Sequence, residues 1–126
     1  MKIRKGVIAV AGHGTRFLPA TKTMPKEMLP IIDKPIVQYI VEEMVEAGIE
    51  QIIFVTSSDK RALEDHFDHN FELETHLKAQ GKKDRLAKIE NLASMANFVY
   101  IRQKGPKGNG TPCLNAKDLI GDEPFV

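Results

Sequence analysis

The sequence is short of three features that would assign it to a specialised class of protein. Its single cysteine, Cys113, has no second cysteine with which to form an internal disulfide, and no histidine stands beside it to suggest a metal site or a catalytic thiol. No apolar run approaches the ~20 residues that a membrane-spanning helix needs. The apolar run near the N-terminus ends in glycines without a cleavage-type site, so we interpret it as a strand and not as a signal peptide. We therefore expect a soluble, cytoplasmic protein with no membrane partner.

Aromatic residues are also scarce where positive charge is concentrated. Residues 1–34 carry a net charge of +5, whereas the whole chain carries +1. Because Phe17 is the only aromatic residue of this segment, it offers no stacking platform, and we expect no nucleic-acid partner. The excess charge favours an anionic ligand near the N-terminal loop, and a solvated basic end is the alternative. The cations of the segment are Lys2, Arg4, Lys5, Arg16, Lys22, Lys26 and Lys34.

Alternating strand and helix patterns predict an α/β fold in one domain. Buried strands have continuous apolar runs, amphipathic helices have apolar residues three and four apart, and glycine ends helices. Strands that alternate with helices form a parallel sheet with right-handed crossovers. The strand patterns lie at 7–11, 51–59 and 97–103, and the helical patterns lie at 36–48, 60–67, 70–95 with a break near Gly81, and 113–121.

The ends of the predicted strands place two glycine-rich loops at one edge of the sheet. Ligands of open parallel sheets bind at the carboxyl ends of the strands, here residues 11–16, 56–59 and 103–110. Three strands are few for such a sheet, and the final "GDEPFV" resembles a turn followed by the start of another strand. We therefore expect an apparently truncated chain, the front part of a larger protein.

The loop after the first strand fits neither of the common phosphate-binding motifs. A dinucleotide fingerprint needs a third glycine and an immediate helix, but prolines at 19, 25 and 30 prevent a regular helix, and Asp33 lies within the loop. A Walker motif needs Gly-Lys-Ser/Thr, which is absent. A loop of this length without secondary structure of its own is usually functional or disordered. We predict that Arg16 and Lys26 act on a triphosphate, and the alternative is that both are ordinary surface cations.

Four segments of the sequence resemble one enzyme family. "AGHGTRFLPATKTMPKEMLPIIDKPIVQYIVEE", "RALEDHFD", "IRQKGPKGNG" and "AKDLIGDEPF" are similar, in this order, to the bacterial UTP-glucose-1-phosphate uridylyltransferases, which are sugar-1-phosphate nucleotidyltransferases. The resemblance implies a Rossmann-like nucleotidyltransferase fold, of which residues 1–126 are the nucleotide-binding portion. It implies the synthesis of UDP-glucose and pyrophosphate from UTP and glucose 1-phosphate with Mg2+, and a homo-oligomer when full length.

The same resemblance implies roles for nine residues, which are Ala11, Gly12, Gly14, Thr15, Arg16, Lys26, Glu27, Gln103 and Gly108. The first two lie along the nucleotide, and the next three lie at its phosphates. Lys26 approaches the phosphates of donor and acceptor, and together with Arg16 it is expected to be catalytic. Glu27 reaches the base edge, Gln103 bonds the uracil, and Gly108 lets the base lie against the backbone.

Two departures from the family keep alternatives open. Relatives usually read Gly-Leu-Gly-His-Ala where this chain reads Gly-Asn-Gly-Thr-Pro, and their metal-binding aspartate follows the "EPF" segment, so we expect the Mg2+ ligand beyond Val126 and no metal ligand here. The alternatives are a thymidylyltransferase or another sugar-1-phosphate nucleotidyltransferase, or a non-catalytic nucleotide-binding regulatory paralogue. His66 and His69 are interpreted as solvated or capping residues and not as a metal site.

Overall fold

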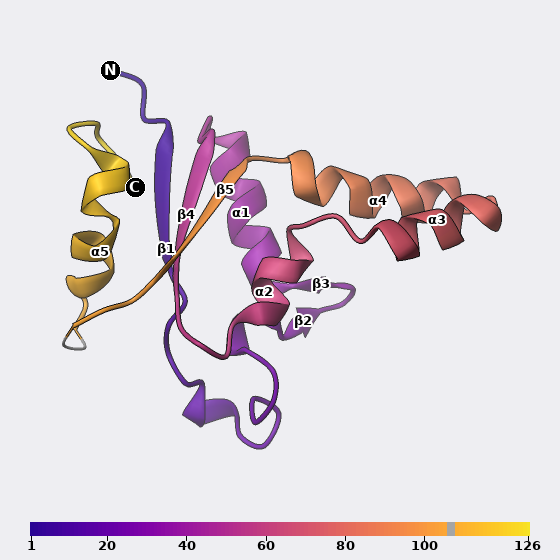
Figure 1. Ribbon diagram of the computed structural model, residues 1–126, viewed down its shortest axis with the longest axis horizontal. Helices are drawn as coiled ribbons and strands as arrows, with labels where there is room; N and C mark the ends of the chain where they lie inside the picture. Colours follow the sequence, from indigo (N-terminus) through magenta and orange to yellow (C-terminus); the bar gives the residue numbers. More distant parts are fainter. Residues whose placement is uncertain (106–107) are drawn as a thin grey trace.

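The computed structural model describes residues 1–105 and 108–126, and its centre is a parallel sheet of three strands in the order β1–β4–β5. The strands are β1 (Lys5–Ala9), β4 (Gln51–Thr56) and β5 (Asn97–Arg102). Helix α5 (Thr111–Ile120) lies on one side of the sheet, and α1 (Ile36–Glu46) and α2 (Arg61–His66) lie on the other (Figure 1). The predicted α/β fold with a parallel-sheet core and flanking helices is confirmed.

Strand β4 is the centre of the core because both of its faces are covered. Side chains of a strand alternate between the two faces of the sheet. Ile52 and Phe54 pack into the cluster that α1 and α2 cover, whereas Ile53 and Val55 pack against α5, and all four are 0% exposed. A continuous apolar run of this kind is typical of a strand in a doubly covered parallel sheet, as the sequence predicts.

Several predicted boundaries shift by about two residues. Strand β1 covers 5–9 and not 7–11, because its parallel pairing with β4 begins at Lys5 opposite Gln51. Helix α5 begins at Thr111 and not at 113, since Pro112 occupies its first turn, where a missing N–H costs nothing. In α1, Val37 and Val41 are buried as expected, but Ile36 and Ile40 of the expected apolar stripe are 37% and 41% exposed.

The loop between β1 and α1 contains short elements that the sequence analysis did not predict. Two 3-10 turns, η1 (Thr15–Phe17) and η2 (Lys26–Met28), lie within it. They are followed by an antiparallel pair, β2 (Pro30–Ile31) and β3 (Lys34–Pro35). The expectation of a loop without secondary structure is therefore wrong, because turns as short as three residues need no helical periodicity.

A helical arm extends from the sheet. It consists of α3 (Phe71–Ala79) and α4 (Lys83–Ser94), which lie side by side and project away from the strands (Figure 1). The break at Gly81, where φ is 69°, is as predicted. Within α3, Glu74 is 6% exposed and its Oε1 lies 3.1 Å from Nδ1 of His69. None of the helices in the described part of the chain is long and apolar enough to cross a membrane.

His66 is partly buried in the last turn of α2, and its burial predicts a pH dependence. Its Nε2 lies 2.8 Å from Oε1 of Gln38, and burial lowers the pKa of its imidazole from the ordinary 6.5. Because the unfolded chain then binds more protons, the free energy of unfolding contributed by His66 falls as the pH drops below about 6.5. We expect His66→Gln to lose less thermal stability than the parent between pH 7 and pH 5. Equal losses in the two proteins would contradict this.

Candidate functional site

Strand β1 has β4 and β5 on one side of it, and the end of the chain returns to its other side. One edge of β1 pairs with β4, and the N–H of Val10 donates to the carbonyl of Val55 (2.9 Å). At the other edge, Phe125 forms a parallel bridge with Lys5, and the N–H of Val7 donates to the carbonyl of Val126 (2.8 Å). The final residues thus run parallel to β1, although they form a single bridge and no strand, and Phe125 and Val126 are 41% and 53% exposed. Such a change of side is a switch point, and open α/β sheets bind ligands there, outside the carboxyl ends of the parallel strands.

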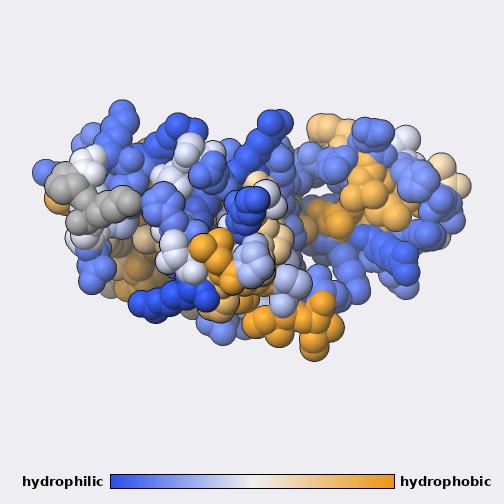
Figure 2. Space-filling view, turned by 90° about the horizontal axis from the view of Figure 1, so that it is seen from below, coloured by the Kyte–Doolittle hydropathy of each residue, from blue (hydrophilic) through white to orange (hydrophobic). Residues whose placement is uncertain are grey.

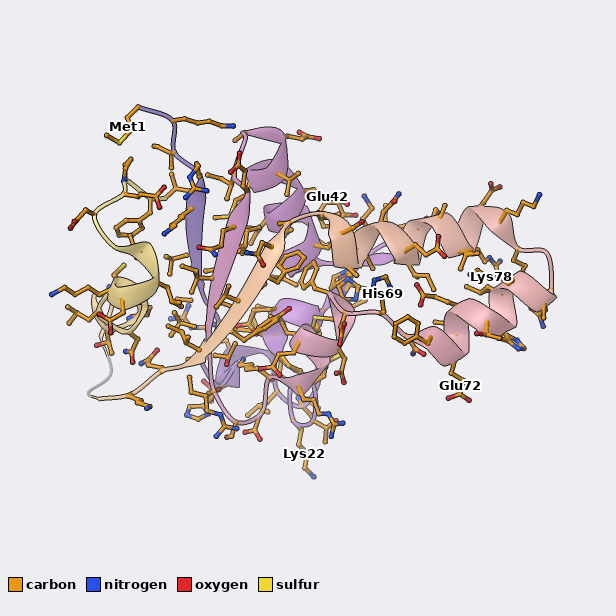
Figure 3. All side chains as sticks on the ribbon, turned by 45° about the horizontal axis from the view of Figure 1, so that its top comes forward. Met1, Lys22, Glu42, His69, Glu72 and Lys78 are labelled. Atoms are coloured by element: carbon orange, nitrogen blue, oxygen red, sulfur yellow. The ribbon has the colours of Figure 1, made fainter. Side chains whose placement is uncertain are left out.

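A cleft of about 630 Å3 opens at this end of the sheet. One wall is the loop after β1, from Gly12 to Pro25, and the other wall is the segment 57–62 that follows β4. Lys22, Lys60 and Arg61 line the cleft, and Asp59 is the one carboxylate among the lining residues that the structure describes. Lys22 extends away from the body of the protein (Figure 3), and the surface seen from this end is hydrophilic over much of its area, with a hydrophobic patch near its middle (Figure 2). The lining therefore suits an anionic, polar ligand.

Gly14 shapes the loop at the mouth of the cleft. Its φ is 65°, in the left-handed region that favours glycine, and the hydroxyl of buried Thr21 donates to its carbonyl at 2.6 Å. A Cβ at this position would lie 3.1 Å from Cβ of Lys26 and 3.3 Å from Cβ of Thr21. Gly14 therefore brings the backbone close to both side chains, and no larger residue fits without displacing them.

Lys26 lies directly over the glycine-rich segment. A Cβ at Gly12 would lie 3.4 Å from Nζ of Lys26, so the absence of a side chain at Gly12 makes room for the ammonium. No carboxylate of the described residues lies within ion-pair distance of Lys26. The structure thus brings together Gly12, Gly14 and Lys26, three of the predicted site residues, with a cation whose charge is not neutralised.

Arg16 and its neighbours lie at the outer side of the same loop. Thr15 and Arg16 are exposed in η1, and in the described part of the chain Arg16 has no ion-pair partner. Ala11 is partly buried between β1 and Gly12. In the sequence, these three residues are neighbours of residues that line the cleft, but they do not line it themselves.

Two of the three predicted base-binding residues, Gln103 and Gly108, lie after β5, on the far side of β4 from β1. Gln103 is partly buried, and its N–H donates to the carbonyl of Thr56 at 2.9 Å. Gly108 is exposed just before α5, and its carbonyl accepts from the N–H of Thr111 (3.2 Å). Neither residue lines the cleft. Part of the second glycine loop, residues 106–107, lies outside the described residues, so its predicted position beside the first loop stays a prediction.

Glu27 forms a buried ion pair with a residue that the sequence analysis did not assign to the site. Oε2 of Glu27 lies 2.9 Å from Nζ of Lys60, and their side chains are 12% and 4% exposed. Lys60 is also the N-cap residue of α2, and no side chain forms a capping hydrogen bond to this helix. The position of Lys60 directly after "TSSD", at the end of a buried strand, was the only signal for it in the sequence.

The described residues do not form a metal site. No three side chains of His, Cys, Asp or Glu are grouped as metal ligands among them. His66 and His69 bond to different partners, Gln38 and Glu74. The site therefore offers cations and backbone N–H groups next to glycines, which can hold and neutralise phosphate.

Comparison with known proteins relates this chain to one family. The family described as "Nucleotidyl transferase" matches residues 5–126. A UTP–glucose-1-phosphate uridylyltransferase of Bacillus subtilis is 60% identical over 125 residues, which are 99% of this chain and 43% of that protein. A uridylyltransferase of Staphylococcus saprophyticus is 59% identical over 99% of this chain and 43% of its own length.

Solved structures show the same relationship. The UTP-bound UGPase from Acinetobacter baumannii superposes with a TM-score of 0.93 at 49% identity, over 98% of this chain and 44% of that chain. A UDP-glucose pyrophosphorylase complexed with UDP-glucose superposes with a TM-score of 0.81 at 48% identity, over 98% of this chain and 44% of its own. The chain spans less than half the length of these relatives. It belongs to the nucleotidyl transferase family.

Proposed function

We propose that the protein carrying this chain transfers a uridylyl group from UTP to glucose 1-phosphate, giving UDP-glucose and pyrophosphate. Residues 1–126 supply the nucleotide-binding portion of the nucleotidyltransferase domain. The observation that supports this most directly is the ammonium of Lys26 over Gly12, at the switch point of the sheet, with no ion-pair partner among the residues that the structure describes. Relatives that are about 60% identical over nearly the whole chain are named UTP–glucose-1-phosphate uridylyltransferases, the enzymes of this reaction.

The reaction needs charge neutralisation more than proton transfer. A phosphate oxygen of glucose 1-phosphate is already ionised at neutral pH, and it forms a bond to the α-phosphorus of UTP. The bond from that phosphorus to the oxygen bridging to the β-phosphate breaks, and the electron pair leaves with pyrophosphate. Negative charge accumulates on the phosphoryl oxygens, so fixed cations stabilise the transition state. No general base is required, and none is assigned to this chain.

The predicted residues have distinct parts in this proposal. Lys26 neutralises charge between donor and acceptor phosphates, and the guanidinium of Arg16 holds the phosphates with its planar donors. Gly12, Gly14 and Thr15 let the phosphates approach the backbone. Ala11 lies along the nucleotide, and Gln103 and Gly108 are assigned to its base. The predicted contact of Glu27 with the base is not part of this proposal, because Oε2 of Glu27 pairs with Lys60.

A chimaera tests the proposal directly. Residues 1–126 replace the matching segment of the Bacillus subtilis relative, and pyrophosphate release is measured with UTP, glucose 1-phosphate and Mg2+. We expect turnover comparable to that of the parental relative. A folded chimaera that binds UTP without turnover would favour a non-catalytic nucleotide-binding role, and a preference for dTTP over UTP would favour a thymidylyltransferase.

A further inference from the structure

Lys60 is a buried cation held at a fixed point of the backbone. The residue is 3% exposed, and it lies between the end of β4 and the first turn of α2. Its N–H donates to the carbonyl of Ser57 (3.3 Å), and its carbonyl accepts from the N–H of Leu63 (3.1 Å). A buried ammonium without a partner would be costly, and the partner here is Glu27, 33 residues earlier in the chain. Lys60 therefore connects the core of the sheet with the turn η2.

Because Glu27 and Lys26 are neighbours in turn η2, anchoring Glu27 also orients Lys26. A 3-10 turn has three residues per turn, so its three side chains point in three different directions. Glu27 points to Lys60, Met28 packs against the core cluster, and Lys26 points to Gly12 and Gly14. Contacts of Glu27 and Met28 with the rest of the protein fix the rotation of the turn. They therefore also fix the direction in which the side chain of Lys26 leaves the backbone.

The ion pair also keeps the charge of Lys26 available. Glu27 is the neighbour of Lys26 in the chain, and its carboxylate would be a competing partner for that ammonium if it were free. In the structure Lys60 takes Oε2 of Glu27 at 2.9 Å, and no carboxylate of the described part of the chain pairs with Lys26. The positive charge of Lys26 is therefore left for an anion in the cleft.

Stability alone gives a weak reason for this buried pair. Removing two charges from water costs much of what their attraction returns, and well-packed apolar residues often replace such pairs without loss of stability. An ion pair that holds another side chain in position has a function besides stability. The exposed pair of Lys2 and Glu50, whose side chains are 67% and 53% exposed, has no comparable constraint.

We propose that Lys60 is a positioning residue of this site, which acts through Glu27 to orient Lys26 and to keep its charge unpaired. The proposal rests on the proposed function, in which Lys26 neutralises the charge of the transferring phosphoryl group. Lys60 itself touches no substrate in this scheme.

The test uses the chimaera and four variants, namely Lys60→Met, Lys60→Arg, Lys26→Gln and the double variant Lys60→Met/Lys26→Gln. We expect Lys60→Met to lower kcat about 100-fold, the effect of a small misplacement of a catalytic group, with a much smaller change in KM for UTP. Lys60→Arg can still pair with Glu27, so it should recover most of the lost turnover. If Lys60 acts through Lys26, adding Lys60→Met to Lys26→Gln should cost little more.

A matched control separates positioning from general destabilisation. Lys5→Met removes another largely buried lysine, 13% exposed and 2.8 Å from Glu123, at the opposite end of β1. We expect Lys5→Met to lower the melting temperature and to leave kcat close to that of the chimaera. Should Lys60→Met fail to fold, Lys60→Met/Glu27→Met leaves no charge unpaired and should fold but still turn over slowly.

Three results would overturn the proposal. They are normal kcat in Lys60→Met, normal kcat in Lys60→Met/Glu27→Met, and a loss in Lys60→Met/Lys26→Gln equal to the product of the two single losses. Unchanged turnover in Lys26→Gln would instead remove the role of Lys26 in the proposed function, and with it the basis of this inference. The two failures are therefore distinguishable.

Discussion

Replacing Arg16 by alanine is expected to slow turnover far more than it weakens nucleotide binding. Arg16 is exposed in η1 and has no ion pair in the part of the chain that the structure describes, so its removal should leave the fold intact. A donor that stabilises transition-state charge typically contributes about 100- to 1,000-fold to kcat. We expect a loss of this size in the chimaera, with about a tenfold loss of UTP affinity.

Steady-state kinetics and equilibrium binding of UTP measure the two effects separately. Arg85→Ala is the control, because Arg85 is an exposed arginine on the projecting arm. It removes the same charge far from the cleft and should change neither quantity. Equal losses of kcat and of affinity in Arg16→Ala would contradict a catalytic role and would leave Arg16 as a residue that only binds the nucleotide.

The second large effect is expected at the centre of the core. Phe54 is 0% exposed, and its ring stacks with three others, with centroid distances of 5.6 Å to Phe67, 6.0 Å to Phe98 and 5.4 Å to Tyr100. Phe54→Ala removes these contacts and leaves a cavity, so it should lower the free energy of unfolding by about 3–5 kcal/mol. The total free energy of unfolding of a native protein is about 5–15 kcal/mol, so the variant should be close to unfolding.

Chemical denaturation followed by circular dichroism measures the effect. Phe71→Ala is the matched control, since Phe71 is 73% exposed at the start of α3. It should change the free energy of unfolding by no more than about 0.5 kcal/mol. A cost below about 1.5 kcal/mol for Phe54→Ala would mean that the core closes over the cavity, against the packing described here.

Most of the regular structure could be predicted from the sequence. The apolar run of β4, the stripe containing Val37 and Val41, and the break at Gly81 are each set within a few neighbouring residues. The glycines at 12 and 14 indicated where a ligand approaches the backbone. These features depend on local periodicity and on backbone preference, which a single sequence carries in full.

The short elements of the loop could not be predicted in this way. Turns η1 and η2 and the pair β2–β3 have two or three residues each, too few to show a period. Their conformations are fixed by contacts from elsewhere, such as the hydroxyl of Tyr39, which donates to the carbonyl of Ile31 at 2.9 Å. Tertiary packing overrides local preference in such segments.

The sequence by itself determined a parallel α/β fold with a cationic glycine loop at the end of its first strand. Only the tertiary structure decided that Glu27 faces Lys60, that Lys26 lies over Gly12, and that Gln103 lies on the far side of β4 from that loop. The physical reason is the range of the interactions. Periodicity and glycine conformations act between near neighbours, whereas an ion pair between residues 33 positions apart forms only when the packed sheet and helices bring its two ends together.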